Sequence, residues 1–239
     1  MYKKGFSAFT LAEVLITLGI IGVVAALTIP TLINNNQKVQ YVTGLKKAYS
    51  EVNQALALMA NDSGCPGDLS CFFDTNDVNT IGDKISSYFK VLKICKAGAS
   101  QLGCFPDVVS WNFDGTNTAS GVEYAGAYRF VTTDGMSVYI PLDINTSCDQ
   151  VMSDPSVKMC VENMMIDING LKKPNIAGRD IFTFLITTGK GPTLYPVGGK
   201  LYDNWITEQG CDYGYNGGVD IGGYRCAGRI MDEGWKMNY

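Results

Sequence analysis

The sequence predicts an α+β protein in which one long N-terminal helix precedes an antiparallel, β-rich head. Three observations lead to this prediction. An apolar run near the start has no charged residue from Val14 to Gln37. Apolar residues then recur at three- and four-residue steps, as on one face of a helix. The rest of the chain is rich in Gly, Asp and Asn and contains short segments of β-branched and aromatic residues.

Composition narrows the function classes. The net charge is −4, and no basic stripe follows the N-terminus, which argues against a nucleic-acid partner. The chain has no histidine, which excludes Ser-His-Asp and Cys-His catalysis and any His-ligated metal. Phosphate-binding glycine loops are also absent from the sequence. We therefore predict a protein that is not an enzyme.

The apolar run is long enough to cross a membrane, which takes about 20 residues. Lys3 and Lys4 precede it, and the positive-inside rule then keeps the N-terminus in the cytoplasm. Two simpler readings stay open at this point: a secretory signal peptide cleaved near Ala25-Ala26, and a plain single-pass anchor.

Glu13 is the unusual residue of this segment. A carboxylate in a membrane helix costs about 2.5–3.5 kcal/mol when it is central, and such residues normally have a partner. Nothing basic follows within two helical turns. Either the side chain is neutral or reaches the interface, or its positive partner comes from another molecule.

The segment Phe9-Thr10-Leu11-Ala12-Glu13 and its apolar continuation resemble the N-terminus of type IV pilins and type II secretion pseudopilins. The resemblance implies that a prepilin peptidase cuts between Ala8 and Phe9 and methylates the new amine. Glu13 is then the fifth mature residue, and Gly22 and Pro30 take the positions where the family usually has Gly and Pro. This chain departs from the family in having Ala8, where Gly is usual.

A second possible cut, between Gly5 and Phe6, shifts Glu13 and Pro30 out of register, so we favour Ala8/Phe9. In a filament Glu13 is then expected to meet the N-terminal amine of a neighbouring subunit, which selects register because an unpaired buried charge is costly. Gly22 and Pro30 are expected to break or kink the helix.

The second half of the helix is predicted to be amphipathic and to pack on the head. Its polar face carries Lys46, Lys47, Glu51 and Asn53. We expect four parts: a leader at 1–8, a transmembrane or assembly helix at 9–33, the amphipathic half of the same helix at 34–60, and an extracytoplasmic head at 61–239. The apolar positions of the amphipathic half are Val42, Leu45, Ala48 or Tyr49, Val52, Leu56 and Met59.

Within the head, residues 128–132 and 136–140 flank Thr133-Asp134-Gly135, which is a hairpin signal. Residues 161–168 and 181–186 are predicted to be further strands. No element is predicted for 61–110 or 187–239.

The eight cysteines all follow the apolar run, and none forms a C-x-x-C pair, which favours disulfides in an oxidising compartment over a zinc site. Pairs of sequence neighbours are expected first, namely Cys65 with Cys71 and Cys148 with Cys160. The remaining candidates are Cys95, Cys104, Cys211 and Cys226.

Asp167, Asn169 and Asp180 lie around an Asn-Gly turn between two predicted strands. Their oxygens are the hard ligands that calcium prefers, although no acidic residue occupies the twelfth position of an EF-hand loop. The alternative is a turn stabilised by its own Asp side chains. We expect no required cofactor, with structural calcium as an open possibility.

The resemblance implies a structural subunit of a type IV pilus or a type II secretion pseudopilus, acting in secretion, adhesion or DNA uptake. Its implied partners are prepilin peptidase, other pilin or pseudopilin subunits, the assembly platform and membrane lipid. It implies a single pass through the bacterial inner membrane, with the head periplasmic or extracellular. The alternatives are a binding module that does not polymerise and a carboxylate-dependent enzyme.

Overall fold

The computed structural model describes residues 10–98, 103–112, 118–119, 122, 126–142, 144, 148, 150–151, 154–189, 193–198, 211 and 222–239. The chain forms two compact units, residues 1–40 and residues 41–239. The N-terminal unit consists of helix in its described part, and the second unit is the head.

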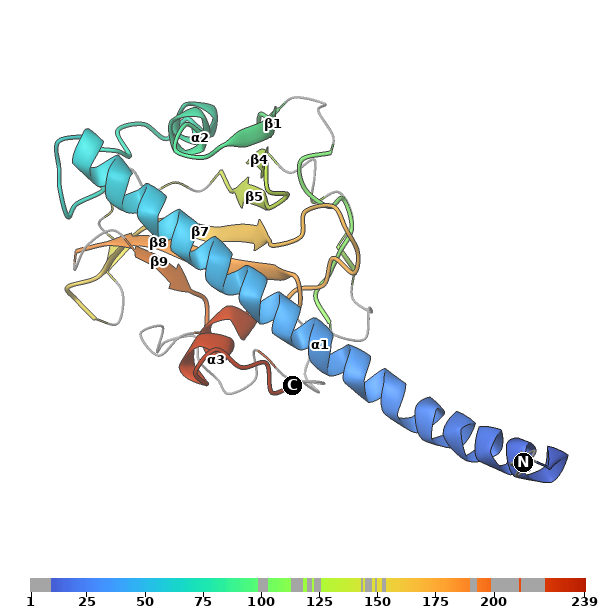
Figure 1. The fold of residues 1–239 in the computed structure, drawn as a ribbon. Coiled ribbons are helices and arrows are strands. Elements are labelled where there is room, and N and C mark those ends of the chain that lie inside the picture. The colour runs from blue at the N-terminus through green and yellow to red at the C-terminus, as the bar shows by residue number, and fades with distance from the viewer. Residues whose placement is uncertain are drawn as a thin grey trace, which may run out of the picture. The chain divides into compact units, whose positions relative to one another are not determined.

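Helix α1 (Leu11–Asp62) is the longest element and contributes to both units (Figure 1). It is continuous through Gly22 and Pro30, so the helix is not interrupted at these residues, and the expected kink stays a prediction. Proline removes one backbone hydrogen bond and crowds the preceding turn, but the flanking residues keep their own bonds and stay helical. The helix ends two residues beyond the predicted Ala60.

The end of α1 is closed by Gly64, which adopts a positive φ of 74°. The amide of Cys65 donates to the carbonyl of Ala60 at 3.1 Å, and the amide of Gly64 donates to Asn61 at 3.1 Å. This pair of bonds is a Schellman motif, which satisfies carbonyl groups that the helix end leaves open.

The head contains an antiparallel sheet in the order β1-β4-β5-β7-β8-β9, and β6 pairs with one end of β7. Within the described residues this sheet has seven strands. A separate two-stranded sheet joins β2 and β3. The bounds are β1 (Val91–Cys95), β2 (Val109–Ser110), β3 (Thr118–Ala119), β4 (Tyr128–Thr132), β5 (Ser137–Ile140), β6 (Gln150–Val151), β7 (Lys158–Asp167), β8 (Ile181–Thr188) and β9 (Thr193–Pro196).

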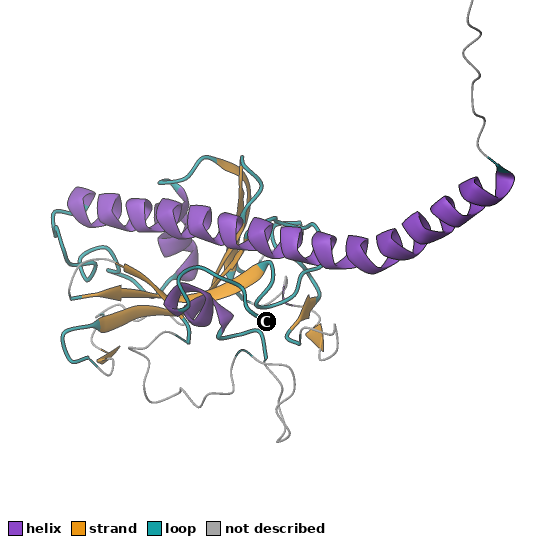
Figure 2. Ribbon diagram, turned by 60° about the horizontal axis from the view of Figure 1, so that its bottom comes forward, coloured by secondary structure: helices purple, strands orange, loops and turns teal. Residues whose placement is uncertain are grey.

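The second half of α1 lies across the sheet, as Figures 1 and 2 both show. The face that packs there is the predicted one, with the addition of Ala55 and Ala60. Its buried residues share one core with Phe130, Ile166 and Phe184 of the sheet. The buried residues of α1 are Val42, Leu45, Ala48, Val52, Ala55, Leu56, Met59 and Ala60.

Two short helices were not predicted. Helix α2 (Val78–Ser86) contacts β4, and α3 (Cys226–Asp232) contacts β8 and β9. Every residue of β8 is buried, so both faces of the sheet are covered at this strand. On the second face Met159, Leu185 and Val197 form a separate small core.

All eight cysteines form disulfides between sequence neighbours. The bonds Cys65–Cys71 and Cys148–Cys160 are the two pairs expected first. The other two bonds are Cys95–Cys104 and Cys211–Cys226.

Candidate functional site: the N-terminal helix and a buried carboxylate pair

The N-terminal half of α1 presents an apolar surface. Its large apolar side chains are all at least 41% exposed in the isolated chain, and Leu11 and Leu27 exceed 70%. By length and composition, α1 is able to cross a membrane. The residues that form this surface are Leu11, Val14, Leu15, Ile16, Leu18, Ile20, Ile21, Val23, Val24, Leu27, Ile29, Leu32 and Ile33.

Glu13 lies in the first turn of α1 and forms a capping box with Thr10. The amide and the hydroxyl of Thr10 donate to the Glu13 carboxylate at 2.8 and 2.9 Å, and the Glu13 amide donates back to the Thr10 hydroxyl at 3.3 Å. The spacing Thr-x-x-Glu is a sequence signal for this motif, and it was missed above. The carboxylate therefore has a local partner at the helix start, where a negative charge also interacts favourably with the helix dipole.

The predicted processing residues, Ala8 and Phe9, lie outside the described residues, as do Lys3 and Lys4. Gly22 and Pro30 lie within α1, and a Cβ atom at Gly22 would meet nothing within 4 Å. Gly22 therefore leaves an open spot on the helix surface, where another helix can approach closely.

The predicted calcium residues meet between the end of β7 and the start of β8. Asp167 Oδ1 accepts from the Asn169 amide at 3.0 Å, and Asp180 Oδ2 accepts from Asn169 Nδ2 at 3.1 Å. Asp180 also accepts from the amides of Asn175 at 2.9 Å and Ile176 at 2.7 Å. The structure therefore brings together all three residues, and it contains the self-bonded turn that was the alternative.

This pair of carboxylates is buried. Asp167 and Asp180 are both 0% exposed. Burial, together with the charge of Asp180, raises the pKa of Asp167 to about 9. Burial likewise raises the pKa of Asp180. Because no solvent reaches either side chain, this pair is not placed to act on a substrate as the paired-carboxylate alternative would require.

The loop between β7 and β8 also connects separate parts of the head. Ser110 of β2 donates its amide to the carbonyl of Asn175 and accepts from the amide of Ala177. The hydroxyl of the last residue, Tyr239, donates to the carbonyl of Gly178 at 2.7 Å. At the β7 end of the loop, a Cβ atom at Gly44 of α1 would lie 2.8 Å from Ile168.

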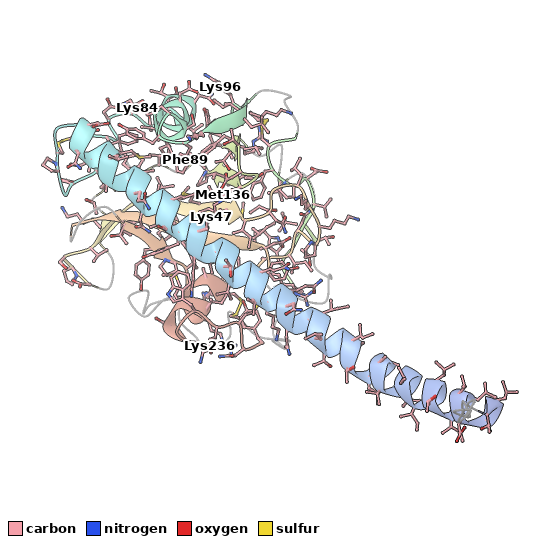
Figure 3. The ribbon with its side chains drawn as sticks, in the orientation of Figure 1. Lys47, Lys84, Phe89, Lys96, Met136 and Lys236 are labelled. Atoms are coloured by element: carbon pink, nitrogen blue, oxygen red, sulfur yellow. A yellow bond between two sulfur atoms is a disulfide. The ribbon has the colours of Figure 1, made fainter. Side chains whose placement is uncertain are left out.

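A groove of about 370 Å³ lies between α1 and the turn that joins β4 to β5. Lys47 of α1 and Phe89, which precedes β1, both line it (Figure 3). Lys47 forms an ion pair with Asp134 of the turn and lies 3.9 Å from Glu51. Burial, with the Asp134 charge, raises the pKa of Glu51. The groove therefore holds a mixed-charge cluster whose members pair with one another.

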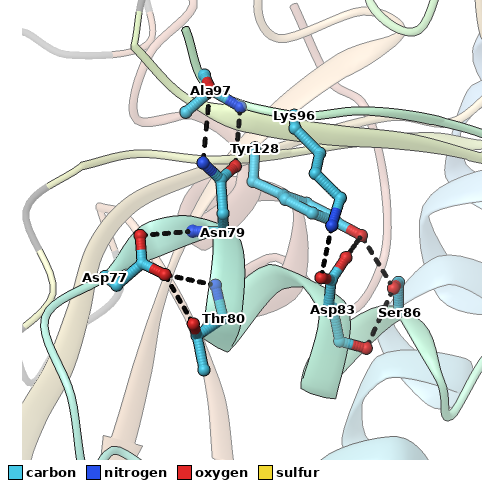
Figure 4. Close-up of polar contacts among 8 residues, drawn as sticks. All are labelled: Asp77, Asn79, Thr80, Asp83, Ser86, Lys96, Ala97 and Tyr128. Carbon is cyan, nitrogen blue, oxygen red and sulfur yellow. Dashed lines mark hydrogen bonds and ion pairs between the residues drawn. The ribbon is translucent and has the colours of Figure 1, made fainter. Parts of the chain in front are cut away.

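Helix α2 is fastened to the sheet by polar contacts (Figure 4). Asp77 caps the helix by accepting from the amides at Asn79 and the following residue. The amide side chain of Asn79 exchanges two hydrogen bonds with the backbone of Ala97. Asp83 accepts from the hydroxyl of Tyr128 at 2.9 Å. All of these contacts hold α2 in place, and each side chain shown is used within the head.

Among the eight half-cystines and the other candidate ligands, no group of three His, Cys, Asp or Glu residues is placed to hold a metal ion in the described part of the chain. Comparisons with family models, curated proteins and solved structures found no match to this chain.

Proposed function

We propose that this chain is a pilin-like structural subunit of a type IV pilus or a type II secretion pseudopilus. In this proposal prepilin peptidase cuts before Phe9, and the subunit polymerises through the N-terminal half of α1. The observation that carries the proposal is the apolar surface from Leu11 to Ile33, with its single carboxylate in the first helical turn.

The exposure of that surface supports polymerisation or membrane insertion. Soluble monomers rarely expose contiguous apolar patches of this length, because water penalises them. A lipid bilayer covers it before assembly, and neighbouring helices cover it afterwards. The glycine at position 22 and the small residues Ala25 and Ala26 permit close helix approach in that second state.

Glu13 is the feature that a plain anchor does not use. Its local partners are the amide and hydroxyl of Thr10, which are neutral, so none of the residues that the structure describes balances its negative charge. In the proposed filament, the N-terminal amine of a neighbouring subunit supplies the positive charge. The pair then fixes the register between subunits, since any other register leaves both charges unpaired.

The test separates the charge from the helix cap. Glu13→Gln keeps a side chain that can complete the capping box but removes the charge. Glu13→Val removes both. Thr28→Val is the matched control, because it removes a polar group in the same stretch whose hydroxyl bonds only to its own helix, at Val24.

We expect both Glu13 variants to be present in the membrane but to fall by at least about tenfold in the filament fraction sheared from cells, because an unpaired buried charge is strongly unfavourable. Thr28→Val should assemble normally. Incorporation of Glu13→Gln at the wild-type level would contradict the proposed pairing and leave the non-polymerising binding module as the better account.

A further inference from the structure

Four buried oxygen atoms around the β7–β8 loop have no hydrogen-bond partner. They are the hydroxyl Oγ of Ser137, Oδ2 of Asp167, and the amide Oδ1 atoms of Asn169 and Asn175. Buried polar atoms are almost always partnered in native proteins, because leaving them bare destabilises the fold. Four such atoms in one region therefore point to a missing partner.

The residues that carry these atoms come from three neighbouring segments, namely β5, the end of β7 and the β7–β8 loop. Ser137 and Asp167 are directly opposite each other on β5 and β7, which places their side chains on one face of the sheet. Asn169 is bonded to both Asp167 and Asp180, and Asn175 is bonded to Asp180. A Cβ atom built on Gly170, beside Asn169, would lie 3.5 Å from Oγ of Ser137.

The same region has an unbalanced charge. Asp167 and Asp180 are fully buried, and neither forms an ion pair with any described residue. Asp180 has N–H donors on both of its oxygens, whereas Asp167 has an oxygen with none. A cation that binds oxygen ligands would partner these atoms and balance the two carboxylates at the same time.

We propose that the head binds one calcium ion through Ser137 Oγ, Asp167 Oδ2, Asn169 Oδ1 and Asn175 Oδ1. Asp180 acts as a positioning residue, because its bond to the Asn169 amide nitrogen leaves the amide oxygen free for the ion. Its charge and that of Asp167 together balance a divalent cation. This refines the sequence-based set, which contained Asp180 as a ligand and missed Ser137 and Asn175.

The ligand set discriminates among cations. Zinc prefers cysteine and histidine, and this site contains neither. Magnesium demands near-ideal octahedral geometry and keeps several waters, whereas calcium accepts irregular sets of carboxylate, amide and hydroxyl oxygens. A calcium ion bound at this site would hold the β7–β8 loop, which contacts β2 and Tyr239, in a fixed position. The proposal concerns the folded head and does not rest on the proposed function.

The test is thermal unfolding of the full chain in detergent, with disulfides intact, after treatment with a calcium chelator. Adding calcium chloride should raise Tm saturably, by about 5–10 °C when calcium exceeds its dissociation constant a hundredfold. Magnesium chloride at the same concentration should give a clearly smaller rise. No rise in Tm with calcium would overturn the proposal and indicate a buried water or a protonated Asp167 instead.

Variants localise the effect. Asp167→Asn keeps the acceptor for the Asn169 amide but removes the charge, so it should abolish the response to calcium without lowering Tm in the chelator. Ser137→Ala loses one ligand and should shift the calcium midpoint to higher concentration, which provides the test if the first variant does not fold. Asp74→Asn is the control, because it changes an exposed carboxylate that forms an ion pair with Lys84, away from the site. Its Tm should respond to calcium like that of the wild type. A wild-type response from both site variants would sink the assignment.

Discussion

Single contacts decide how closely the elements of the head approach one another. Gly82 of α2 faces the ring of Tyr128, and a Cβ atom at this position would lie 2.1 Å from the ring carbon Cγ. Real atoms do not approach so closely, so the ring or the helix would have to move. Tyr128 is itself held by the hydroxyl bond to Asp83, and it is fully buried, which leaves it little room to yield.

We therefore expect Gly82→Ala to destabilise the head by about 1–3 kcal/mol, as overpacking usually does. The better helix propensity of alanine offsets part of this cost. Urea unfolding of the full chain should show a lower midpoint with an unchanged slope. Gly22→Ala is the control, since it makes the same change in the other unit, at a position with open space. Equal midpoints for Gly82→Ala and wild type would contradict the described packing.

At the same scale, sequence reasoning found Glu13 but not its local partner. The cost of a carboxylate in an apolar helix singled out Glu13, and that argument concerns one residue. The capping box with Thr10 depends on where the helix begins, and helix starts are hard to place within two residues from sequence alone. A Thr-x-x-Glu pattern before an apolar run was the available signal.

At the scale of elements, strands with strong local patterns were predicted well. The hairpin β4–β5 and the strands β7 and β8 were found within a few residues of their bounds. The edge strand β1 was missed because its partner β4 is distant in the sequence and its burial does not alternate. The edge strand β9 was missed although it pairs with the preceding strand β8 and its residues alternate between half-buried and buried. Helix α2 was missed although Asp77 is a favourable N-cap residue followed by Val78, Ile81 and Ile85 at helical spacing.

The disulfides differ in how much they constrain the head. Cys148 and Cys160 are both buried and join the segment before β6 to β7, whereas Cys71 is exposed. Replacing both Cys148 and Cys160 with alanine should lower the free energy of unfolding by about 2–4 kcal/mol, because it removes a loop closure and buried sulfur contacts. The matched Cys65→Ala, Cys71→Ala pair closes a shorter loop at the surface and should cost less. Thermal unfolding of both double variants checks the order, and the reverse order would contradict it.

At the scale of the whole molecule, periodicity and hydropathy were sufficient for the α+β class and the two-part α1. They were insufficient for the site in the head. Asp167, Asn169 and Asp180 are close in sequence and were found together, but Ser137 joins them only through the register of β5 on β7. Register is a long-range property, set by the packing of both strands, and no local pattern reveals it.

The central claim is that this chain is processed and polymerised as a pilin-like subunit. The most direct measurement is the mass and N-terminal sequence of the mature protein isolated from its own membranes. Our account predicts a start at Phe9, with or without one added methyl group. An intact Met1 would contradict it and indicate a plain anchor, and a start beyond Ala26 would contradict it by indicating a secreted protein.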